Sequence, residues 1–248
     1  MGGSVLKKVY VVGIGAGNYD GMTVGAVKVL ENADIIVGYT VYVDLIRPFF
    51  PDKQFLSTPM MKETERCRLA LEKAAEGNTV AMICSGDAGI YGMASPILEL
   101  AVEYGVEAEI IAGVTAASSG AALLGSPITC DFAVLSLSDL LTPFDVIMKR
   151  IESVASADMC MVIYNPSSKK RSDYLAKACE TVMRYRSQTT VCGICRNIGR
   201  EGESFEITTL AELANTQADM FSTVFIGNSS TKIVNGRIVT PRGYSYER

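Results

Sequence analysis

The residues with the clearest capacity for chemistry near the start of the chain are the glycines of "VYVVGIGAGNYDGMT", residues 9–23. An apolar run leads directly into Gly13, Gly15 and Gly17, and Thr23 is placed to cap the helix that follows. Glycines in a strand-to-helix turn permit close backbone approach, which suits a ligand held against strand ends. A plain tight turn has the same spacing, and the loop alone does not decide between the two.

A dinucleotide site is not supported by this stretch. The third glycine of G-x-G-x-x-G would be residue 18, which is Asn18. The second predicted strand ends in Gly38 and Tyr39, without the acidic residue that would hold a ribose, and Asp34 lies before that strand. The sequence therefore argues against a nicotinamide-dependent oxidoreductase.

Three further segments place polar residues at the ends of predicted elements. "CSGDAGIYG" follows a buried strand, and the carboxylate of Asp87 can accept hydrogen bonds from a ligand hydroxyl or amine. "AGVTAASS" places Thr115 and Ala116 at the start of a helix, and "VIYNP" ends a strand in residues that suit edge-on contact with an adenine. Each segment alone is as readily structural as functional.

The absence of histidine excludes several classes of enzyme. With no histidine in the chain, Ser-His-Asp hydrolysis, Cys-His proteolysis and His-rich zinc sites are ruled out. Proton transfer must fall to carboxylates, Tyr, Lys, Cys, water or the substrate. Cys192 and Cys195 have C-x-x-C spacing, but "TTVCGICRN" has the pattern of a strand, in which residues three apart face opposite sides. We therefore expect no metal site, and we expect the cysteines to be buried thiols.

The composition argues against nucleic acid and membrane as partners of this protein. The 248 residues are 48% hydrophobic and 20% charged, as in a globular protein, and the net charge of −4 disfavours nucleic acid as a partner. Lys169-Lys170-Arg171 is the one short basic cluster. No stretch reaches the roughly 20 apolar residues that span a bilayer, and no secretory signal is evident, so we expect a cytoplasmic protein without membrane contact.

Strand and helix patterns alternate in the first part of the chain, which predicts a parallel sheet covered by helices. The expected strands are 8–13, 35–38, 79–84 and 108–112. The expected helices are 23–32, 62–76 and 96–104, with Cys67, Leu71 and Ala74 on one face of the second. After residue 113 a small-residue helix precedes the strands "FAVLSLSD", "MCMVIYNP", "TTVCGICR", "ESFEITTL" and "TVFIGN", and "NGRIVTPRGY" resembles a closing strand pair. The predicted division is residues 1–113 and 114–248.

Together, in this order and spacing, these segments resemble the tetrapyrrole methylase family, from Lys8 to about Arg242. "IVGYTVYVDL", "SGDAGIYGMA", "DFAVLSLSDLLTPF", "YNPSSKKR" and "NIGREGE" resemble the branch that methylates precorrin-3B, or cobalt-factor III, at carbon 17 with ring contraction in cobalamin biosynthesis. The resemblance implies an α/β fold of two lobes, a parallel sheet in the first and a mixed sheet in the second. It also implies a homodimer, with S-adenosylmethionine bound in the cleft between the lobes and released as S-adenosylhomocysteine.

The resemblance also implies roles for residues at matching positions. Those expected to bind the cofactor are Ser85, Gly86, Asp87, Ile90, Thr115, Ala116, Asn165 and Asn197. Those expected to face the tetrapyrrole are Gly13, Gly15, Gly17, Arg196 and Arg200. Lys169, Lys170 and Arg171 are further cations for the substrate's carboxylates, although a solvated helix start explains them equally well.

Methyl transfer from a sulfonium requires mainly alignment, and Asp87 is the natural electrostatic partner of that cation. Ring contraction would benefit from an acid or base. Our candidate is Asp139 in "SLSDLL", with Ser138 or Tyr91 as second choices, and the alternative for Asp139 is a cap on a helix starting at Leu140.

Two departures from the family pattern stand out. Ala16 replaces the proline of the usual G-x-G-P-G loop, and Cys130-Asp131 stands where the branch commonly shows a His-Asp pair. The other functions we consider are methylation of a different corrin carbon, of diphthine or of ribosomal RNA, and a noncatalytic tetrapyrrole carrier. The sequence does not decide whether the substrate contains cobalt.

Overall fold

The structure, a computed structural model, describes residues 7–168 and 170–245. It divides into two compact units, Met1–Ala116 and Ala117–Arg248. The sequence places this division slightly earlier, between residues 113 and 114. The small-residue helix α5 (Ala116–Leu124) packs within the second unit, because Ala117, Ala121 and Leu124 belong to that unit's core.

The first unit is built on a five-stranded parallel sheet with the strand order β3-β2-β4-β1-β5. Its strands are β1 (Lys8–Gly13), β2 (Ile35–Tyr39), β3 (Gln54–Thr58), β4 (Val80–Cys84) and β5 (Glu107–Ile111). The central strands β1, β2 and β4 are near-continuous apolar runs because both faces of a parallel sheet are covered. All five carboxyl ends therefore lie along one edge.

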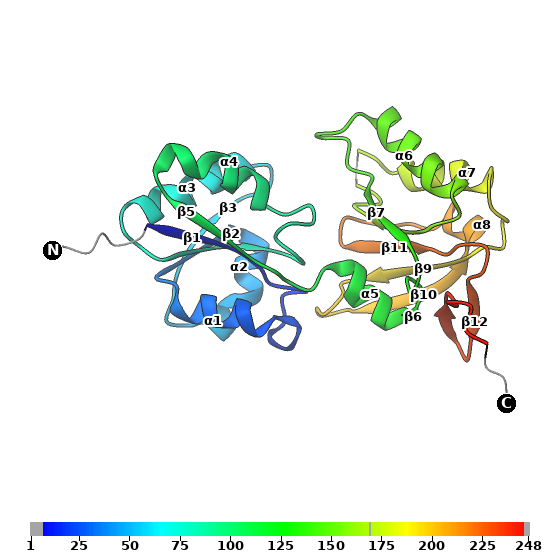
Figure 1. Ribbon diagram of the computed structural model, residues 1–248, viewed down its shortest axis with the longest axis horizontal. Coiled ribbons are helices and arrows are strands. Elements are labelled where there is room, and N and C mark those ends of the chain that lie inside the picture. The colour runs from blue at the N-terminus through cyan, green and yellow to red at the C-terminus, as the bar shows by residue number, and fades with distance from the viewer. Residues whose placement is uncertain (1–6, 169, 246–248) are drawn as a thin grey trace. The chain divides into compact units, whose positions relative to one another are not determined.

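Helices cover both faces of this sheet (Figure 1). They are α1 (Val24–Asn32), α2 (Thr40–Ile46), α3 (Glu63–Ala75) and α4 (Ala94–Tyr104), with short 3₁₀ turns at Tyr19–Gly21 and Arg47–Phe49. One face packs on α3 and α4, and the other on α1 and α2. As predicted, the Thr23 hydroxyl caps α1 by accepting from the Ala26 amide at 3.1 Å, and Cys67, Leu71 and Ala74 are buried on α3.

The second unit contains a mixed five-stranded sheet in the order β10-β9-β11-β8-β7. Its strands are β7 (Phe132–Ser136), β8 (Cys160–Tyr164), β9 (Val191–Arg196), β10 (Ser204–Thr209) and β11 (Ser222–Ile226). β7 and β8 pair in parallel, whereas β11 is antiparallel to both β8 and β9. Consequently β7, β8 and β9 run in one direction, and their carboxyl ends share an edge.

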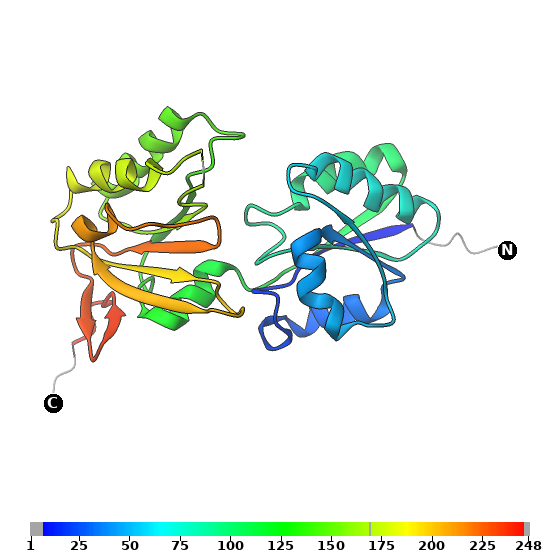
Figure 2. The same cartoon turned by 180° about the vertical axis from the view of Figure 1, so that it is seen from behind.

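One face of this mixed sheet packs on three helices and the other on α5. The three are α6 (Phe144–Ser156), α7 (Tyr174–Met183) and α8 (Leu210–Leu213). A third, small sheet has the order β12-β13-β6. It contains β6 (Gly125–Ser126), β12 (Lys232–Val234) and β13 (Arg237–Val239). Figure 2 shows the β12–β13 hairpin in red, near the carboxyl end of the chain.

The predicted fold class is confirmed, with a parallel sheet in the first unit and a mixed sheet in the second. Cys192 lies in the core under α6 and α7 and Cys195 in the core under α5, so the C-x-x-C pair does face opposite sides of β9. Among the helices of the described residues, none is long and apolar enough to cross a membrane.

Candidate active site

Three loops meet at the carboxyl edge of the first sheet. The glycine loop follows β1, the Ser85–Gly86–Asp87 loop follows β4, and Gly113 to Thr115 follow β5. The amide of Gly15 donates to the carbonyl of Gly86 at 3.0 Å, and the amide of Gly86 donates back to Gly15 at 2.7 Å. The glycine loop and the Ser-Gly-Asp loop are therefore one hydrogen-bonded structure rather than two independent turns.

The glycines of these loops are required by packing against other parts of the protein, which are backbone atoms at Gly13 and Gly15 and a side chain at Gly17. A Cβ on Gly13 would lie 2.7 Å from the amide nitrogen of Gly113 and 2.7 Å from the carbonyl oxygen of Gly86. A Cβ on Gly15 would meet the Gly21 carbonyl at 2.3 Å, and one on Gly17 would meet Leu45 at 2.9 Å. The missing side chains of these glycines therefore make room for other atoms of the protein itself.

Asp87 connects two of the three loops. Its Oδ1 accepts from the amides of Gly89 at 2.8 Å and Ile90 at 3.2 Å, and its Oδ2 accepts from the amide of Gly113 at 2.9 Å. A carboxylate has about four acceptor positions, so about one is left for a ligand. The sequence predicted Asp87 only as a residue that binds a ligand. In the structure its carboxylate also organises the loops around it.

The surface of these loops combines apolar and polar groups. Ile90 is 39% exposed and Tyr91 is 59% exposed, and Tyr91 has a left-handed backbone with φ of 54°. Ser85 and Thr115 are half-buried, as is Gly86 with φ of 70°. Beneath them, burial raises the pKa of the Cys84 thiol to about 11, and its Sγ accepts from the Met93 amide at 3.4 Å. The predicted first-unit residues thus gather at one sheet edge.

The predicted adenine-binding residues lie in the second unit, at the carboxyl ends of β8 and β9. Asn165 follows β8 and Asn197 follows β9, and both have left-handed backbones, with φ of 50° and 51°. The Asn165 amide nitrogen donates to the Ser136 hydroxyl at 3.1 Å, at the end of β7. The Tyr164 hydroxyl accepts from the Ala117 amide at 2.7 Å, at the start of α5. Parallel strand direction therefore places the two asparagines along one edge.

Asp139 lies in the loop after β7 and does not cap a helix. The helix of this region, α6, starts at Phe144 and not at Leu140, so the capping alternative is wrong. The Tyr174 hydroxyl donates to Oδ2 of Asp139 at 2.7 Å, and Nε of Arg171 lies 3.6 Å from Oδ1. The hydrogen bond to this carboxylate raises the pKa of Tyr174. Ser138, the neighbouring candidate, is half-buried, and its amide donates to the Ser136 hydroxyl.

The basic residues differ in how much of their charge is already engaged. Arg171 is not a solvated helix start: its side chain is 14% exposed, and it donates to the Leu137 carbonyl at 2.9 Å and the Ser168 hydroxyl at 3.1 Å. Lys170 is exposed, and Lys169 lies outside the described residues. Arg171 therefore holds the loop of Asp139, a role the sequence did not reveal because it joins positions far apart in the chain.

Arg196 and Arg200 are the predicted substrate-binding cations. Arg196 at the end of β9 lies 3.7 Å from the Glu206 carboxylate and donates to the Gln217 carbonyl at 3.3 Å. The backbone of Arg200 closes a turn with Asn197 at 2.9 Å. Both side chains are half-buried.

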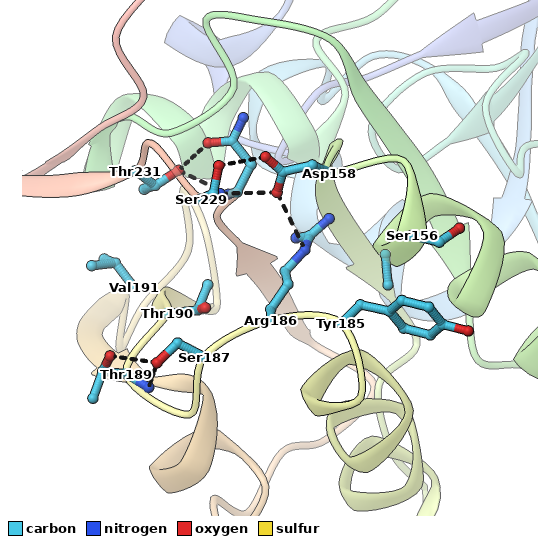
Figure 3. Close-up of a pocket in the computed structure, with 12 residues that line it drawn as sticks. Ser156, Asp158, Tyr185, Arg186, Ser187, Thr189, Thr190, Val191, Ser229 and Thr231 are labelled. Carbon is cyan, nitrogen blue, oxygen red and sulfur yellow. Dashed lines mark hydrogen bonds and ion pairs between the residues drawn. The ribbon is translucent and has the colours of Figure 1, made fainter.

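A separate hollow lies at the opposite edge of the second sheet (Figure 3). Its lining comes from the segments before β8 and β9 and after β11, including Asp158, Arg186 and Ser229. No residue that we predicted to bind cofactor or substrate lines this hollow.

Comparison with known proteins identifies the family. Residues 8–214 match the family described as Tetrapyrrole (Corrin/Porphyrin) Methylases. This chain belongs to the tetrapyrrole methylase family. The match covers the three loops of the first unit and both asparagines of the second, so the residues predicted from the resemblance lie inside the shared region.

Two relatives of this tetrapyrrole methylase are particularly similar in sequence. The chain is 48% identical over 240 residues to "Cobalamin biosynthesis protein CbiHC" of Archaeoglobus fulgidus, covering 96% of the chain but 53% of that protein. It is 44% identical over 237 residues to "Probable cobalt-factor III C(17)-methyltransferase" of Salmonella typhimurium, covering 95% of the chain and 98% of that protein. The chain thus spans about half of the first relative and nearly all of the second.

A solved structure has the same fold as this tetrapyrrole methylase. "Crystal structure of the methyltransferase CobJ" superposes with a TM-score of 0.86 at 34% identity, over 94% of this chain and 99% of that one. The fold of this chain is therefore that of a known methyltransferase.

Proposed function

We propose that this tetrapyrrole methylase transfers a methyl group from S-adenosylmethionine to carbon 17 of cobalt-factor III or precorrin-3B in cobalamin biosynthesis. The observation that carries the proposal is the 44% identity to a probable cobalt-factor III C(17)-methyltransferase over nearly the full length of both chains. The 34% identity to CobJ at a TM-score of 0.86 supports the same branch. We propose in addition that the ring is contracted on this protein and that the protein is a cytoplasmic homodimer.

The loops of the first unit fit S-adenosylmethionine. That molecule has an amino acid head, ribose hydroxyls and a sulfonium whose methyl and methylene groups are apolar. The Ser85 and Thr115 hydroxyls, with the remaining acceptor position of Asp87, match the polar groups, and exposed Ile90 matches the apolar part. Bound S-adenosylmethionine would supply the methyl group on its sulfonium.

The contribution of the chain is then alignment. The reacting carbon must lie about 3 to 3.5 Å from the methyl group, in line with the leaving sulfur, and correct placement supplies much of the rate. The Asp87 carboxylate accepts from the backbone amides of Gly89, Ile90 and Gly113, and so joins the loop that contains Ile90 to the segment that contains Gly113. The loops proposed to surround the sulfonium are therefore held in one geometry before substrate binds. We propose that Asn165 and Asn197 bind the adenine.

For the tetrapyrrole we propose the backbone of the glycine loop and the side chains of Arg196 and Arg200 as contacts. Asp139 is our candidate acid or base for ring contraction, with Ser138 and Tyr91 as second choices. Arg171 and Tyr174 hold the Asp139 carboxylate in a defined position, which supports a role that depends on orientation.

The experiment combines binding with product analysis. The purified protein is titrated calorimetrically with S-adenosylhomocysteine, using NAD as the parallel control. It is then incubated with ¹³C-methyl S-adenosylmethionine and either cobalt-factor III or precorrin-3B, and the product is examined by NMR. We expect micromolar binding of S-adenosylhomocysteine, no binding of NAD, and one labelled methyl group at carbon 17 of a contracted ring.

Other results would redirect the proposal. A folded protein that does not bind S-adenosylhomocysteine but binds the tetrapyrrole would be a carrier. A label on another carbon would place the chain in a different branch of the family. A label at carbon 17 of an uncontracted ring would separate methylation from ring contraction, and the preferred substrate would show whether cobalt is present.

A further inference from the structure

Arg66 is a buried arginine without a counter-charge among the residues that the structure describes. It lies in the first turn of α3, is 5% exposed, and shares the buried stripe of Ala70 and Ala74. Its Nη2 donates to the Pro59 carbonyl at 3.1 Å, and its guanidinium lies 5.8 Å from the centre of the Tyr39 ring. Its Nε has no hydrogen-bond partner, and among residues 7–168 and 170–245 no carboxylate lies within ion-pair distance of it.

The second unit provides a comparison, because it contains another buried arginine, Arg186. The side chain of Arg186 is 3% exposed, and its Nε lies 3.8 Å from Oδ1 of Asp158 (Figure 3). Its terminal nitrogens donate to the carbonyls of Gly227 at 2.6 Å, Met159 at 2.5 Å and Val154 at 3.2 Å. Arg186 therefore has a counter-charge and three carbonyl acceptors, although its Nε, like that of Arg66, has no hydrogen-bond partner. Among the described residues, Arg66 has one acceptor, an aromatic face and no counter-charge.

A second unpartnered group lies beside Arg66. Thr58, the last residue of β3, is 4% exposed, and its hydroxyl has no hydrogen-bond partner. Thr58 immediately precedes Pro59, whose carbonyl contacts Arg66. Buried polar groups without partners are rare and costly, so two of them at one place require an explanation.

This place lies on the same sheet edge as the proposed cofactor loops. Thr58 and Tyr39 end β3 and β2, and Cys84 ends β4, the strand next to β2. Next to Pro59, the side chains of Met60 and Met61 are 45% and 71% exposed.

We propose that Arg66, with the Thr58 hydroxyl, forms a subsite for one carboxylate side chain of the tetrapyrrole substrate. This inference rests on the proposed function, because it assigns a contact to that substrate. A carboxylate would supply the missing counter-charge and accept from the unused N–H groups of the guanidinium, whose planar fork matches a carboxylate in two parallel bonds.

The surroundings favour a macrocycle with acidic side chains over a small free anion. The exposed Met60 and Met61 offer apolar, adaptable surface beside the buried charge. No side chain caps the amino end of α3, so its backbone dipole adds to the attraction for a negative group. Glu63 and Glu65 of the same turn are exposed to solvent, and Glu65 pairs with Lys62 at 2.9 Å.

The test compares Arg66→Met with Arg68→Met, a matched control on the exposed side of the same helix. Binding of uroporphyrin III, a stable polycarboxylate tetrapyrrole, is followed by fluorescence, and KM is measured for cobalt-factor III and for S-adenosylmethionine. For Arg66→Met we expect tetrapyrrole affinity to fall roughly tenfold to a hundredfold, as for a lost charged hydrogen-bonding partner. KM for S-adenosylmethionine should change by less than about twofold, and Arg68→Met should behave as wild type.

Stability distinguishes a ligand subsite from a structural clamp. Removing an unbalanced buried charge or an unpartnered hydroxyl should leave the free protein as stable as wild type or more stable. We therefore expect Arg66→Met and Thr58→Val to keep or raise the melting temperature while both weaken tetrapyrrole binding. Arg66→Lys keeps the charge without the planar fork, so its tetrapyrrole affinity should lie between those of wild type and Arg66→Met. This variant replaces Arg66→Met in the test if Arg66→Met does not fold.

Three results would overturn the subsite. The first is an unchanged tetrapyrrole affinity in Arg66→Met. The second is a loss of S-adenosylhomocysteine affinity in Arg66→Met as large as its loss of tetrapyrrole affinity. The third is a lowered melting temperature in both Arg66→Met and Thr58→Val. The experiment distinguishes failure of the Arg66 subsite from failure of the proposed function. Methylation at carbon 17 with an unchanged KM in Arg66→Met would refute the subsite alone. Uroporphyrin III binding that depends on Arg66, without any methyl transfer by wild type, would refute the proposed function alone.

Discussion

Asp87 and Gly113 are joined by a hydrogen bond of 2.9 Å from the Gly113 amide to the Asp87 carboxylate. The bond links the loop after β4 to the segment after β5. The other oxygen of the carboxylate accepts from Gly89 and Ile90, so one side chain sets the shape of the proposed cofactor loops. Its effects on stability and on cofactor binding should therefore appear together.

Asp87→Asn should both destabilise the protein and weaken cofactor binding. The amide keeps one acceptor oxygen but presents an N–H group where a second acceptor is needed, and it removes the charge that strengthens these bonds. We expect the free energy of unfolding to fall by about 1.5–3 kcal/mol, measured by urea denaturation. Affinity for S-adenosylhomocysteine should fall in the same variant, measured by calorimetry.

Asp20→Asn is the control for this experiment, because Asp20 is exposed in the same unit. It should match wild type in both measurements. Full stability in Asp87→Asn combined with lost binding would mean that Asp87 serves the ligand and not the loops.

Gly113→Ala and Gly25→Ala should have opposite effects on stability. A Cβ on Gly113 would lie 2.2 Å from the Gly86 carbonyl oxygen and 2.6 Å from the Gly13 carbonyl carbon, both backbone atoms that cannot turn away. A Cβ on Gly25, exposed in α1, would meet nothing closer than 3.8 Å. We expect Gly25→Ala to raise the free energy of unfolding by about 0.5–1 kcal/mol, the usual gain for alanine in a helix.

For Gly113→Ala we expect the free energy of unfolding to fall by about 1–3 kcal/mol, as for other overpacked interiors. Urea denaturation of both variants measures the contrast. A cost below about 1 kcal/mol for Gly113→Ala, within the range of a harmless substitution, would show that the three loops separate easily and that packing does not explain the glycines.

Sequence patterns were most informative where a residue's neighbours along the chain determine its structure. The apolar run of β1 and the cap by Thr23 depend on nearby residues, and both appear as predicted. Helix α6 could also have been found, because Ile147, Ile151 and Ala155 repeat at the spacing of one helix face and are buried. The one helix considered for this region, as the alternative role of Asp139, starts at Leu140, whereas α6 starts at Phe144.

Contacts between residues far apart in the sequence could not be predicted from the sequence. Tyr174 is 35 positions from Asp139, and neither residue type signals the other. Arg66 did carry a usable signal, since an arginine shares the helical stripe of Ala70 and Ala74. A charged residue on an apolar stripe is rarely buried without a partner, and among the described residues Arg66 forms no ion pair with a carboxylate. The glycine spacing predicted a turn that allows close backbone approach, but it could not reveal that the approaching backbone is that of Gly86 and Gly113.

Tyr174→Phe should affect activity in a way that Tyr185→Phe does not. Both tyrosines donate to a carboxylate, Tyr174 to Asp139 at 2.7 Å and Tyr185 to Glu152 at 2.8 Å, so the two variants lose the same chemistry. Only Tyr174 orients the candidate acid or base. We expect Tyr174→Phe to lower kcat for the contracted product about tenfold, with KM for S-adenosylmethionine unchanged and Tyr185→Phe near wild type. Equal activity in the two variants would remove Asp139 from the mechanism.

The pH dependence of stability provides a second readout for Tyr174. Its hydrogen bond to Asp139 raises the pKa of Tyr174 above the unfolded value of about 10. The folded protein therefore holds the proton more tightly, so the stabilisation is fully present below about pH 10 and is lost as the pH rises through the folded pKa. The stability difference between wild type and Tyr174→Phe should be constant from about pH 7 to 9 and shrink above about pH 10. A constant difference up to pH 11 would contradict the bond.

Cys130 should be the one cysteine that reacts quickly in the folded protein. It is half-buried, whereas the other six cysteines are buried. Burial raises the pKa of Cys67 and Cys84 to about 11 and of Cys179 and Cys195 to about 12, and it raises the pKa of Cys192 as well. Because the thiolate is the reactive form, these thiols should be inert near pH 8. Ellman's reagent should therefore release one equivalent rapidly from native protein, none from Cys130→Ser, and the full number after unfolding in urea. Fast reaction at Cys192 or Cys195 in the Cys130→Ser variant would mean that β9 is open to solvent and that the C-x-x-C pair has chemistry of its own.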